Sequence, residues 1–270
     1  MREHRVTGAA AERIAEGLSR RDQAIADTVR RVRVVTGRQL ERLHFAELLG
    51  AHRDRTRRRV LARLTDLQVL TTLDRRIGGA RAGSAGLVFA LGVVGQRLAA
   101  LLPHRDNPTQ ERVRRPGSPT DRFLKHSLAV SELYVQLVEL ARHQHFTLAG
   151  FRAEPACWWQ DSTGNWIKPD AYVCLETADL TDSWAIEVDR ATESPSTIRH
   201  KLSVYLQLVE LGDNGPDGDV LPRVLITVPD EQRRTILYNL IQELPDPAMR
   251  LFTVVLHENA ARFTIEVLRE

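Results

Sequence analysis

Two stretches in the second half of the chain alternate between apolar and polar residues, Ile167–Val173 and Trp184–Arg190. This alternation predicts two β-strands, and the polar residues between them predict a turn. A strand sends successive side chains to opposite faces, so Glu187 and Asp189 share one face and the apolar side chains share the other. If the two strands are neighbours, Asp170 joins them. Three carboxylates are therefore expected to converge on one side of a sheet.

Helical and strand patterns surround these two stretches. Arg122 to about His143 predicts a helix that is apolar nearly all round, with Glu132 among its few polar residues. Ser194 caps a later helix, on which Lys201 lies at the edge of the buried face. The remaining predicted elements are a strand at 146–154, a strand at 220–228, a helix at 231–244 and a strand at 250–257. The order predicts an α/β domain with a mixed central sheet.

The first half of the chain has a different pattern. Residues 8–32 predict one long amphipathic helix, Thr36 caps a second helix, and Asp54 caps a third that runs from Arg55 to about Leu67. Two apolar stretches, 69–73 and 86–91, flank a loop rich in glycine and arginine and predict a hairpin. Three helices and a hairpin are typical of a winged helix-turn-helix, whose third helix enters a DNA groove and whose wing contacts phosphates. Winged helices that dock proteins are the alternative.

Charge is distributed unevenly between the two halves. Residues 1–120 hold 24 arginines, no lysine and 12 acidic residues, whereas residues 121–270 carry a net charge of −9. Basic segments of this kind bind nucleic-acid phosphates, although solvated helix faces are an alternative explanation. The predicted DNA-binding residues are Arg53, Arg55, Arg57, Arg58, Arg59, Arg63, Arg75, Arg76 and Arg81.

The composition sets further bounds. The chain of 270 residues fits two domains, which we place at 1–103 and 121–270, with a proline-containing linker at 104–120. The two cysteines, Cys157 and Cys174, have no metal-type spacing and are expected to be buried in a reducing compartment. No signal peptide or membrane span is evident, so a soluble, cytoplasmic protein is expected.

Pro169-Asp170 on one strand and Glu187-x-Asp189 on the next, within an αβββαβ order, resemble the PD-(D/E)XK nuclease fold, which is restriction-endonuclease-like. Longer stretches resemble the replication-relaxation family of actinobacterial, plasmid-linked proteins. They are Leu124–Leu128 with Glu132, Ile167–Ala171, Glu187–Ser194, Lys201 with Tyr205, and Leu221–Asp230. This resemblance covers most of the chain from about residue 30.

The resemblance implies a protein that binds double-stranded plasmid or mobile-element DNA during replication, relaxation or mobilisation. It also implies a DNA endonuclease or nickase that uses Mg²⁺, or Mn²⁺ as a substitute. Asp170, Glu187 and Asp189 would be the metal ligands and, together with Lys201, the catalytic residues. Glu132 would be a supporting acid. A homodimer is expected by analogy.

The chain departs from the nuclease pattern at Asp189, where that pattern has a lysine. An aspartate cannot replace a cation, so Lys201 from the next helix or Lys168 from the strand would have to supply the charge. The third alternative is a non-catalytic DNA-binding accessory factor or transcriptional regulator that keeps the nuclease-like fold as a scaffold.

Overall fold

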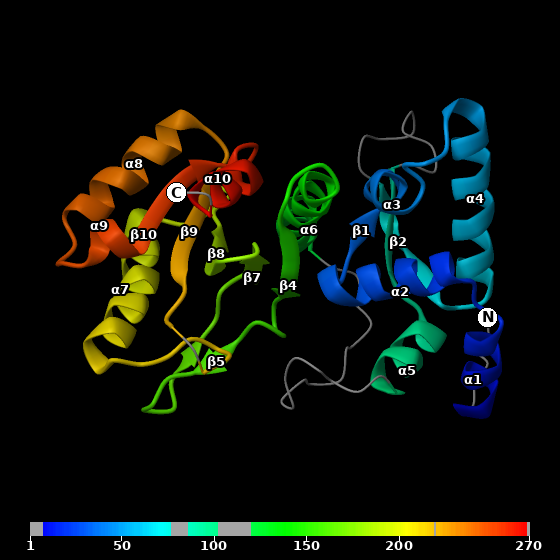
Figure 1. Ribbon diagram of the computed structural model, residues 1–270, viewed down its shortest axis with the longest axis horizontal. Helices are drawn as coiled ribbons and strands as arrows, with labels where there is room; N and C mark the ends of the chain where they lie inside the picture. The colour runs from blue at the N-terminus through cyan, green and yellow to red at the C-terminus, as the bar shows by residue number, and fades with distance from the viewer. Residues whose placement is uncertain (1–7, 77–85, 102–119, 219, 269–270) are drawn as a thin grey trace. The chain divides into compact units, whose positions relative to one another are not determined.

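A computed structural model describes residues 8–76, 86–101, 120–218 and 220–268 (Figure 1). The architecture is mixed α/β, and the chain divides into two compact units, Met1–Val135 and Gln136–Glu270. This division falls inside helix α6, Asp121–Ala141. The sequence places the boundary earlier, at 104–120, a range of which only residue 120 lies within the described residues.

The N-terminal unit combines helices with a small antiparallel sheet. Its elements are α1 (Gly8–Glu16), α2 (Arg20–Val32), β1 (Val35–Thr36), α3 (Gly37–His44), α4 (Gly50–Asp66), β2 (Leu70–Arg76), β3 (Leu87–Leu91), α5 (Val93–Leu101) and the first part of α6. The strand order is β1-β3-β2. The predicted hairpin is present as β2 and β3, and the two-residue strand β1 was not predicted.

Side-chain caps set where these helices begin. The prediction of one helix over 8–32 is wrong, because Ser19 and Asp22 form a capping box that starts α2 as a separate helix. The predicted cap at Thr36 is confirmed by a hydrogen bond of 3.1 Å from the amide of Gln39 to its hydroxyl. The predicted cap at Asp54 is wrong, since α4 begins at Gly50 and Asp54 lies within its first turns.

The first part of α6 completes the core of the N-terminal unit. Leu124 and Leu128 pack with Val34 and with apolar residues of β2 and β3. The hydroxyl of Ser131, which is fully buried, donates a hydrogen bond of 2.6 Å to the carbonyl oxygen of Val34. Residues 121–135 therefore belong structurally with the elements that precede them.

The C-terminal unit is built on a five-stranded sheet with the order β10-β9-β8-β7-β4. Its elements after α6 are β4 (Thr147–Ala153), β5 (Trp159–Gln160), β6 (Trp166–Ile167), β7 (Ala171–Glu176), β8 (Thr181–Val188), α7 (Pro195–Leu211), β9 (Arg223–Val228), α8 (Glu231–Gln242), α9 (Ala248–Leu251), β10 (Phe252–Leu256) and α10 (Ala260–Val267). Strand β7 is antiparallel to both of its neighbours, β4 and β8, whereas β8, β9 and β10 are parallel. The predicted mixed sheet is thus present.

The two faces of this sheet carry different helices. Helices α7, α8 and α9 cover one face, where they share an apolar core with Ala185 of β8 and with alternate residues of β9 (Figure 1). Trp184, the neighbour of Ala185, instead meets Phe263 of α10 edge to face at a centroid distance of 6.0 Å. The predicted alternation along β8 is therefore confirmed, whereas α10 was not predicted.

The prediction of one continuous strand over Ile167–Val173 is wrong. Ile167 ends β6, which pairs with β5 in a separate hairpin, and β7 begins only at Ala171. Pro169 between them has no amide hydrogen for a strand ladder. Its carbonyl oxygen accepts a hydrogen bond of 3.1 Å from the thiol of the buried Cys157. Asp170 therefore stands at the start of β7 rather than within a strand.

Candidate functional site

Asp170 and Glu187 are brought together at the end of the β7–β8 ladder. The last residue pair of the ladder is Ala171 with Ile186, and the amide of Asp170 donates a hydrogen bond of 2.9 Å to the carbonyl oxygen of Ile186. The amide of Val188 in turn donates a hydrogen bond of 2.7 Å to Oδ2 of Asp170. The side chain of Asp170 thus continues the ladder and lies across from Glu187.

Glu187 is a buried carboxylate with two polar partners from α7. Only 7% of its surface is exposed. The hydroxyl of Tyr205 donates a hydrogen bond of 2.7 Å to Oε1, and Nζ of Lys201 lies 3.6 Å from Oε2. Burial, and then the charge of Asp170, raise the pKa of Glu187 to about 8, although Lys201 and Tyr205 act in the opposite direction. Glu187 therefore holds a proton to a higher pH than an exposed glutamate does.

Lys201 bridges two carboxylates. Its Nζ lies 3.1 Å from Oε2 of Glu193 in addition to its contact with Glu187. Burial by itself lowers the pKa of Lys201, but the charges of Glu187, Asp170 and Glu193 outweigh burial and raise the pKa above its ordinary value. Lys201 stays protonated at neutral pH, which suits it to stabilise negative charge and not to accept a proton.

Asp189 lies on the same side of the sheet but has other partners. Its Oδ2 accepts a hydrogen bond of 2.5 Å from Nε of Arg233, and its Oδ1 accepts one of 2.9 Å from the amide of Ala191. Asp189 and Arg233 are both buried, with 6% and 8% of their surfaces exposed. Asp189 as a metal ligand therefore stays a prediction, and in the structure its Oδ2 is held by the ion pair with Arg233 and its Oδ1 by the turn at Ala191.

Glu132, the predicted supporting acid, has its partners in the N-terminal unit. Its Oε2 accepts a hydrogen bond of 2.9 Å from Nε2 of Gln39, and its Oε1 accepts one of 2.5 Å from Arg42. Lys168, the other candidate for the missing cation, places its Nζ 5.2 Å from the centre of the Trp158 ring. Of the two lysines considered, Lys201 is the one that pairs with Glu187.

Three of the predicted DNA-binding arginines are engaged in ion pairs within the N-terminal unit. Arg57 is buried and pairs with Glu41, which also lies 3.2 Å from Nε of Arg53. Arg63 donates hydrogen bonds of 2.6 and 2.7 Å to the two oxygens of Asp22. Burial alone would raise the pKa of Asp22, but Arg63 and Ser19 lower it below its ordinary value. Arg57 in particular joins α4 to α3 and is not available to a phosphate.

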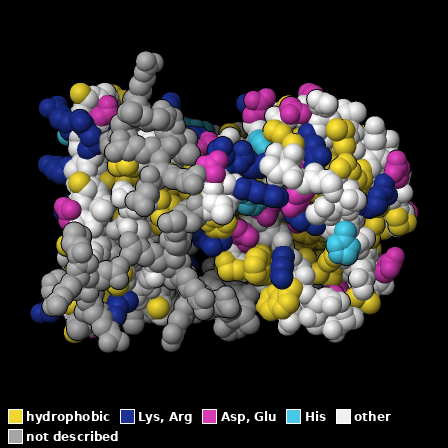
Figure 2. All heavy atoms as spheres, turned by 180° about the vertical axis from the view of Figure 1, so that it is seen from behind, with side chains coloured by type: hydrophobic (Ala, Val, Ile, Leu, Met, Phe, Trp, Pro, Cys, Tyr) yellow, Lys and Arg dark blue, Asp and Glu magenta, His cyan; other side chains and the backbone are white. Residues whose placement is uncertain are grey.

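The other predicted arginines divide into exposed and undescribed ones. The exposed ones on α4 are Arg55, Arg58 and Arg59. Figure 2 shows Lys and Arg side chains gathered along the edge of the N-terminal unit where Figure 1 draws α4. Arg75 and Arg76 lie in β2, but their side chains are outside the described residues, as is Arg81 altogether.

Two residues of the site escaped prediction, Glu193 and Arg233. Glu193 sits in the connection between β8 and α7, where no periodic pattern assigns a side-chain direction. Arg233 contacts Asp189 from the first turn of α8, on the face of the sheet that α8 covers. Its neighbour Arg234 is also an arginine, so the sequence alone could not say which of the two turns inward. The only local signal was the cap at Asp230, which fixes the start of the helix.

The side chains of the site offer only part of the coordination that a magnesium ion needs. Among the described residues, no group of three or more His, Cys, Asp or Glu side chains is arranged to hold a metal ion. Asp170 and Glu187 supply two carboxylates. Mg²⁺ is commonly held by one or two carboxylates, with water and substrate phosphate completing its octahedron. The residues present thus fit Mg²⁺ bound together with a phosphate, and do not fit a site formed by protein ligands alone.

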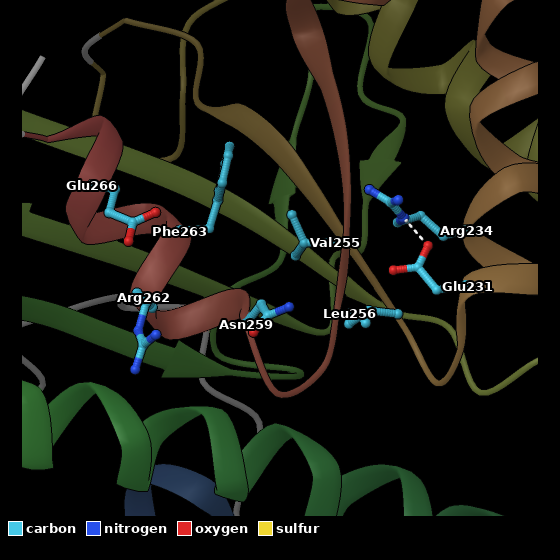
Figure 3. Close-up of a pocket in the computed structure, with 8 residues that line it drawn as sticks. All are labelled: Glu231, Arg234, Val255, Leu256, Asn259, Arg262, Phe263 and Glu266. Atoms are coloured by element: carbon cyan, nitrogen blue, oxygen red, sulfur yellow. Dashed lines mark hydrogen bonds and ion pairs between the residues drawn. The ribbon is translucent and has the colours of Figure 1, made fainter.

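A separate surface pocket lies between α8, β10 and α10 (Figure 3). Its lining includes Phe263 and Val255 as apolar side chains and the ion pair between Arg234 and Glu231. None of its lining residues belongs to the site around Asp170, Glu187 and Lys201.

Among the helices of the described segments, none is both long enough and apolar enough to cross a membrane.

Comparison with known protein families identifies this chain's relationship. The profile of the replication-relaxation family matches residues 27–224, a span that runs from α2 into β9 and includes Asp170, Glu187 and Lys201. No curated protein matches the chain significantly. The match extends over more than half of the sequence. The chain therefore belongs to the replication-relaxation family.

Proposed function

We propose that this protein binds double-stranded DNA of a plasmid or mobile element through its N-terminal unit and nicks it with Mg²⁺ at Asp170 and Glu187 in its C-terminal unit. Membership of the replication-relaxation family supports a role in plasmid replication or relaxation. The observation that carries the nuclease proposal is the ammonium group of Lys201, which lies 3.6 Å from Glu187 and is also stabilised by the charge of Asp170.

The N-terminal unit supports the DNA-binding half of the proposal. Its order α2-β1-α3-α4-β2-β3, with a β1-β3-β2 sheet, supports the assignment to a winged helix because it matches the order of elements expected for that fold. In that arrangement α4 is the helix that enters the major groove. The exposed arginines Arg55, Arg58 and Arg59 lie on this helix. Phosphate contacts from such side chains give binding that weakens with salt.

The C-terminal unit supports the nuclease half. Asp170 and Glu187 would hold Mg²⁺. The bound ion would polarise the scissile phosphate and lower the pKa of a water molecule that attacks it. Glu187 must first lose the proton that its raised pKa retains, since a ligating carboxylate is deprotonated. Lys201 remains positively charged and stabilises the charge that develops on the phosphate. In this proposal Lys201 supplies the cation that the pattern has at the position of Asp189.

A non-catalytic DNA-binding factor is the second candidate. The observation in its favour is the buried ion pair between Asp189 and Arg233, which occupies the position of the nuclease lysine. In this case the carboxylate pair is a remnant, and the protein acts by binding DNA alone.

A plasmid nicking assay in Mg²⁺ or Mn²⁺ separates the two candidates. Asp170→Asn keeps an oxygen for the amide of Val188 while it removes the ligating charge, and Asp179→Asn changes an exposed residue of the β7–β8 turn as a control. We expect nicking by the wild type and the control, and a rate about 10²-fold lower for Asp170→Asn. Equal rates in all three, or no metal-dependent nicking by the wild type, would favour the non-catalytic factor.

A further inference from the structure

We propose that Asp189 and Arg233 form a buried clamp that positions the β8–α7 connection, and through Glu193 holds Lys201 against the carboxylate pair. The clamp would explain why an aspartate stands at the position where the nuclease pattern has a lysine. This inference rests on the proposed nuclease function. In it, Arg233 is a positioning residue that acts through Glu193 and Lys201.

Arg233 reaches two separate points of the connection with two different nitrogen atoms. Its Nε donates to Oδ2 of Asp189 at 2.5 Å, and its Nη2 donates to the carbonyl oxygen of Glu193 at 2.8 Å. The start and the end of the segment 189–193 are thus tied to the same guanidinium group. A lysine has one nitrogen on a flexible stem and cannot hold both acceptors in a fixed geometry.

The backbone inside the clamp adopts a conformation that needs support. Ala191 has a φ of 55°, in the left-handed region that residues with a Cβ rarely occupy. Its amide donates a hydrogen bond to Oδ1 of Asp189, and the amide of Asp189 donates one of 2.9 Å to the carbonyl oxygen of Thr227 in β9. Such conformations cost free energy and persist only where the surroundings determine them.

The clamped segment delivers the carboxylate of Glu193 to Lys201. The Nζ of Lys201 is 3.1 Å from Glu193 but 3.6 Å from Glu187, so Glu193 is its nearer partner. Glu193 carries no helical or strand constraint of its own, since α7 begins only at Pro195. The hydrogen bond from Arg233 to its carbonyl oxygen ties the backbone of Glu193 to α8, and thereby helps to set where its carboxylate meets the ammonium group of Lys201.

The test compares two neighbouring arginines of α8. Arg233→Gln and Arg233→Lys break the clamp, whereas Arg234→Gln removes only an exposed ion pair with Glu231 (Figure 3). Nicking of supercoiled plasmid is measured as kcat and KM. We expect kcat of both Arg233 variants to fall by about 10²-fold at nearly unchanged KM, because displacement of a catalytic group by about 1 Å costs that much. Arg234→Gln should behave as the wild type.

A second measurement reports on Lys201 directly and does not require cleavage. The chain holds only three lysines, Lys125, Lys168 and Lys201, so ¹³C-lysine NMR gives three side-chain signals, and Lys201→Arg identifies one of them. In Arg233→Gln the Lys201 signal should move toward that of an exposed lysine, and in Arg234→Gln it should stay. The double variant Asp189→Asn with Arg233→Gln, which leaves no unpaired buried charge, should show the same shift in a folded protein.

The outcomes separate the clamp from the nuclease function. An unmoved Lys201 signal in the folded double variant, or full kcat in Arg233→Lys, would overturn the clamp even if the wild type nicks DNA. A wild type that does not nick DNA would refute the nuclease proposal, while the shift of the Lys201 signal would still support the clamp.

Discussion

The ammonium group of Lys201, a residue of helix α7, lies 3.6 Å from the carboxylate of Glu187, a residue of strand β8. The spacing along α7 explains how this happens. Tyr205, which donates a hydrogen bond to the same carboxylate, follows Lys201 by one helical turn. The two side chains therefore reach the sheet together.

This arrangement predicts that substitution of Lys201 slows plasmid nicking, whereas substitution of Lys168 does not. Lys201→Met should lower the rate of plasmid nicking by about 10²–10³-fold, because it removes a charge aimed at the scissile phosphate. Lys168→Met, which alters only a cation held over the Trp158 ring, should leave the rate near that of the wild type. Rates of both variants on supercoiled plasmid in Mg²⁺ decide the matter. The reverse order of effects would assign the missing cation to Lys168.

The raised pKa of Glu187 predicts a pH-dependent stability. The folded protein retains the proton up to about pH 8, whereas the unfolded chain loses it near its ordinary pKa of 4.5. The free energy of unfolding of the wild type should therefore fall as pH rises through this window, by at most about 1.4 kcal/mol per pH unit. Glu187→Gln mimics the protonated form and should lack this slope.

Urea unfolding of the two proteins without divalent metal, from about pH 5 to about pH 9, measures the difference. The stability of Glu187→Gln relative to the wild type should grow with pH and level off above about pH 8. Parallel pH profiles for the two proteins would show that Glu187 is already ionised in the folded state near neutral pH.

The arginines of α4 should fall into two functional groups. Arg58→Ala with Arg59→Ala should weaken binding to duplex DNA and reduce the slope of log affinity against log salt by about one for each lost phosphate contact. Arg57→Ala should instead destabilise the fold by about 3–5 kcal/mol, because it leaves Glu41 without its main buried partner. Binding titrations at several salt concentrations and urea unfolding separate the two effects. Unchanged DNA affinity in the double variant would move the DNA contact away from α4.

Local rules predicted most elements of both units. The capping residues Thr36 and Ser194, the β2–β3 hairpin and the alternation along β8 follow from short sequence patterns that tertiary structure does not override. The split at Ser19 was missed because the apolar spacing of residues 8–32 continues across the break. Ile167–Val173 was misassigned because alternation alone does not reveal that Pro169 interrupts the strand.

The sequence predicted only part of the site around Asp170 and Glu187. The period of a strand brings Asp170 and Glu187 together, and the period of a helix directs Lys201 toward them. Whether Asp189 faces a metal or a counter-ion depends on Arg233, which comes from a distant helix. Pairings between distant elements follow from the packing of the whole unit, so a local pattern could not assign the partner of Asp189, or that of Glu132.

Glu132 provides a test of such a long-range pairing. It joins α6 to α3 within the N-terminal unit through Gln39 and Arg42, and about a third of its side chain is exposed. Glu132→Ala should therefore lower the free energy of unfolding by about 0.5–1.5 kcal/mol, since the loss of a partly screened ion pair leaves the amide of Gln39 with a poorer partner. Nicking should stay near the wild-type rate.

Glu231→Ala, which breaks an exposed ion pair on α8, serves as the control and should lower the free energy of unfolding by less than about 0.5 kcal/mol. If Glu132→Ala instead slows nicking as strongly as Asp170→Asn does while stability is unchanged, then Glu132 acts at the carboxylate site and its pairing with Arg42 does not describe its function.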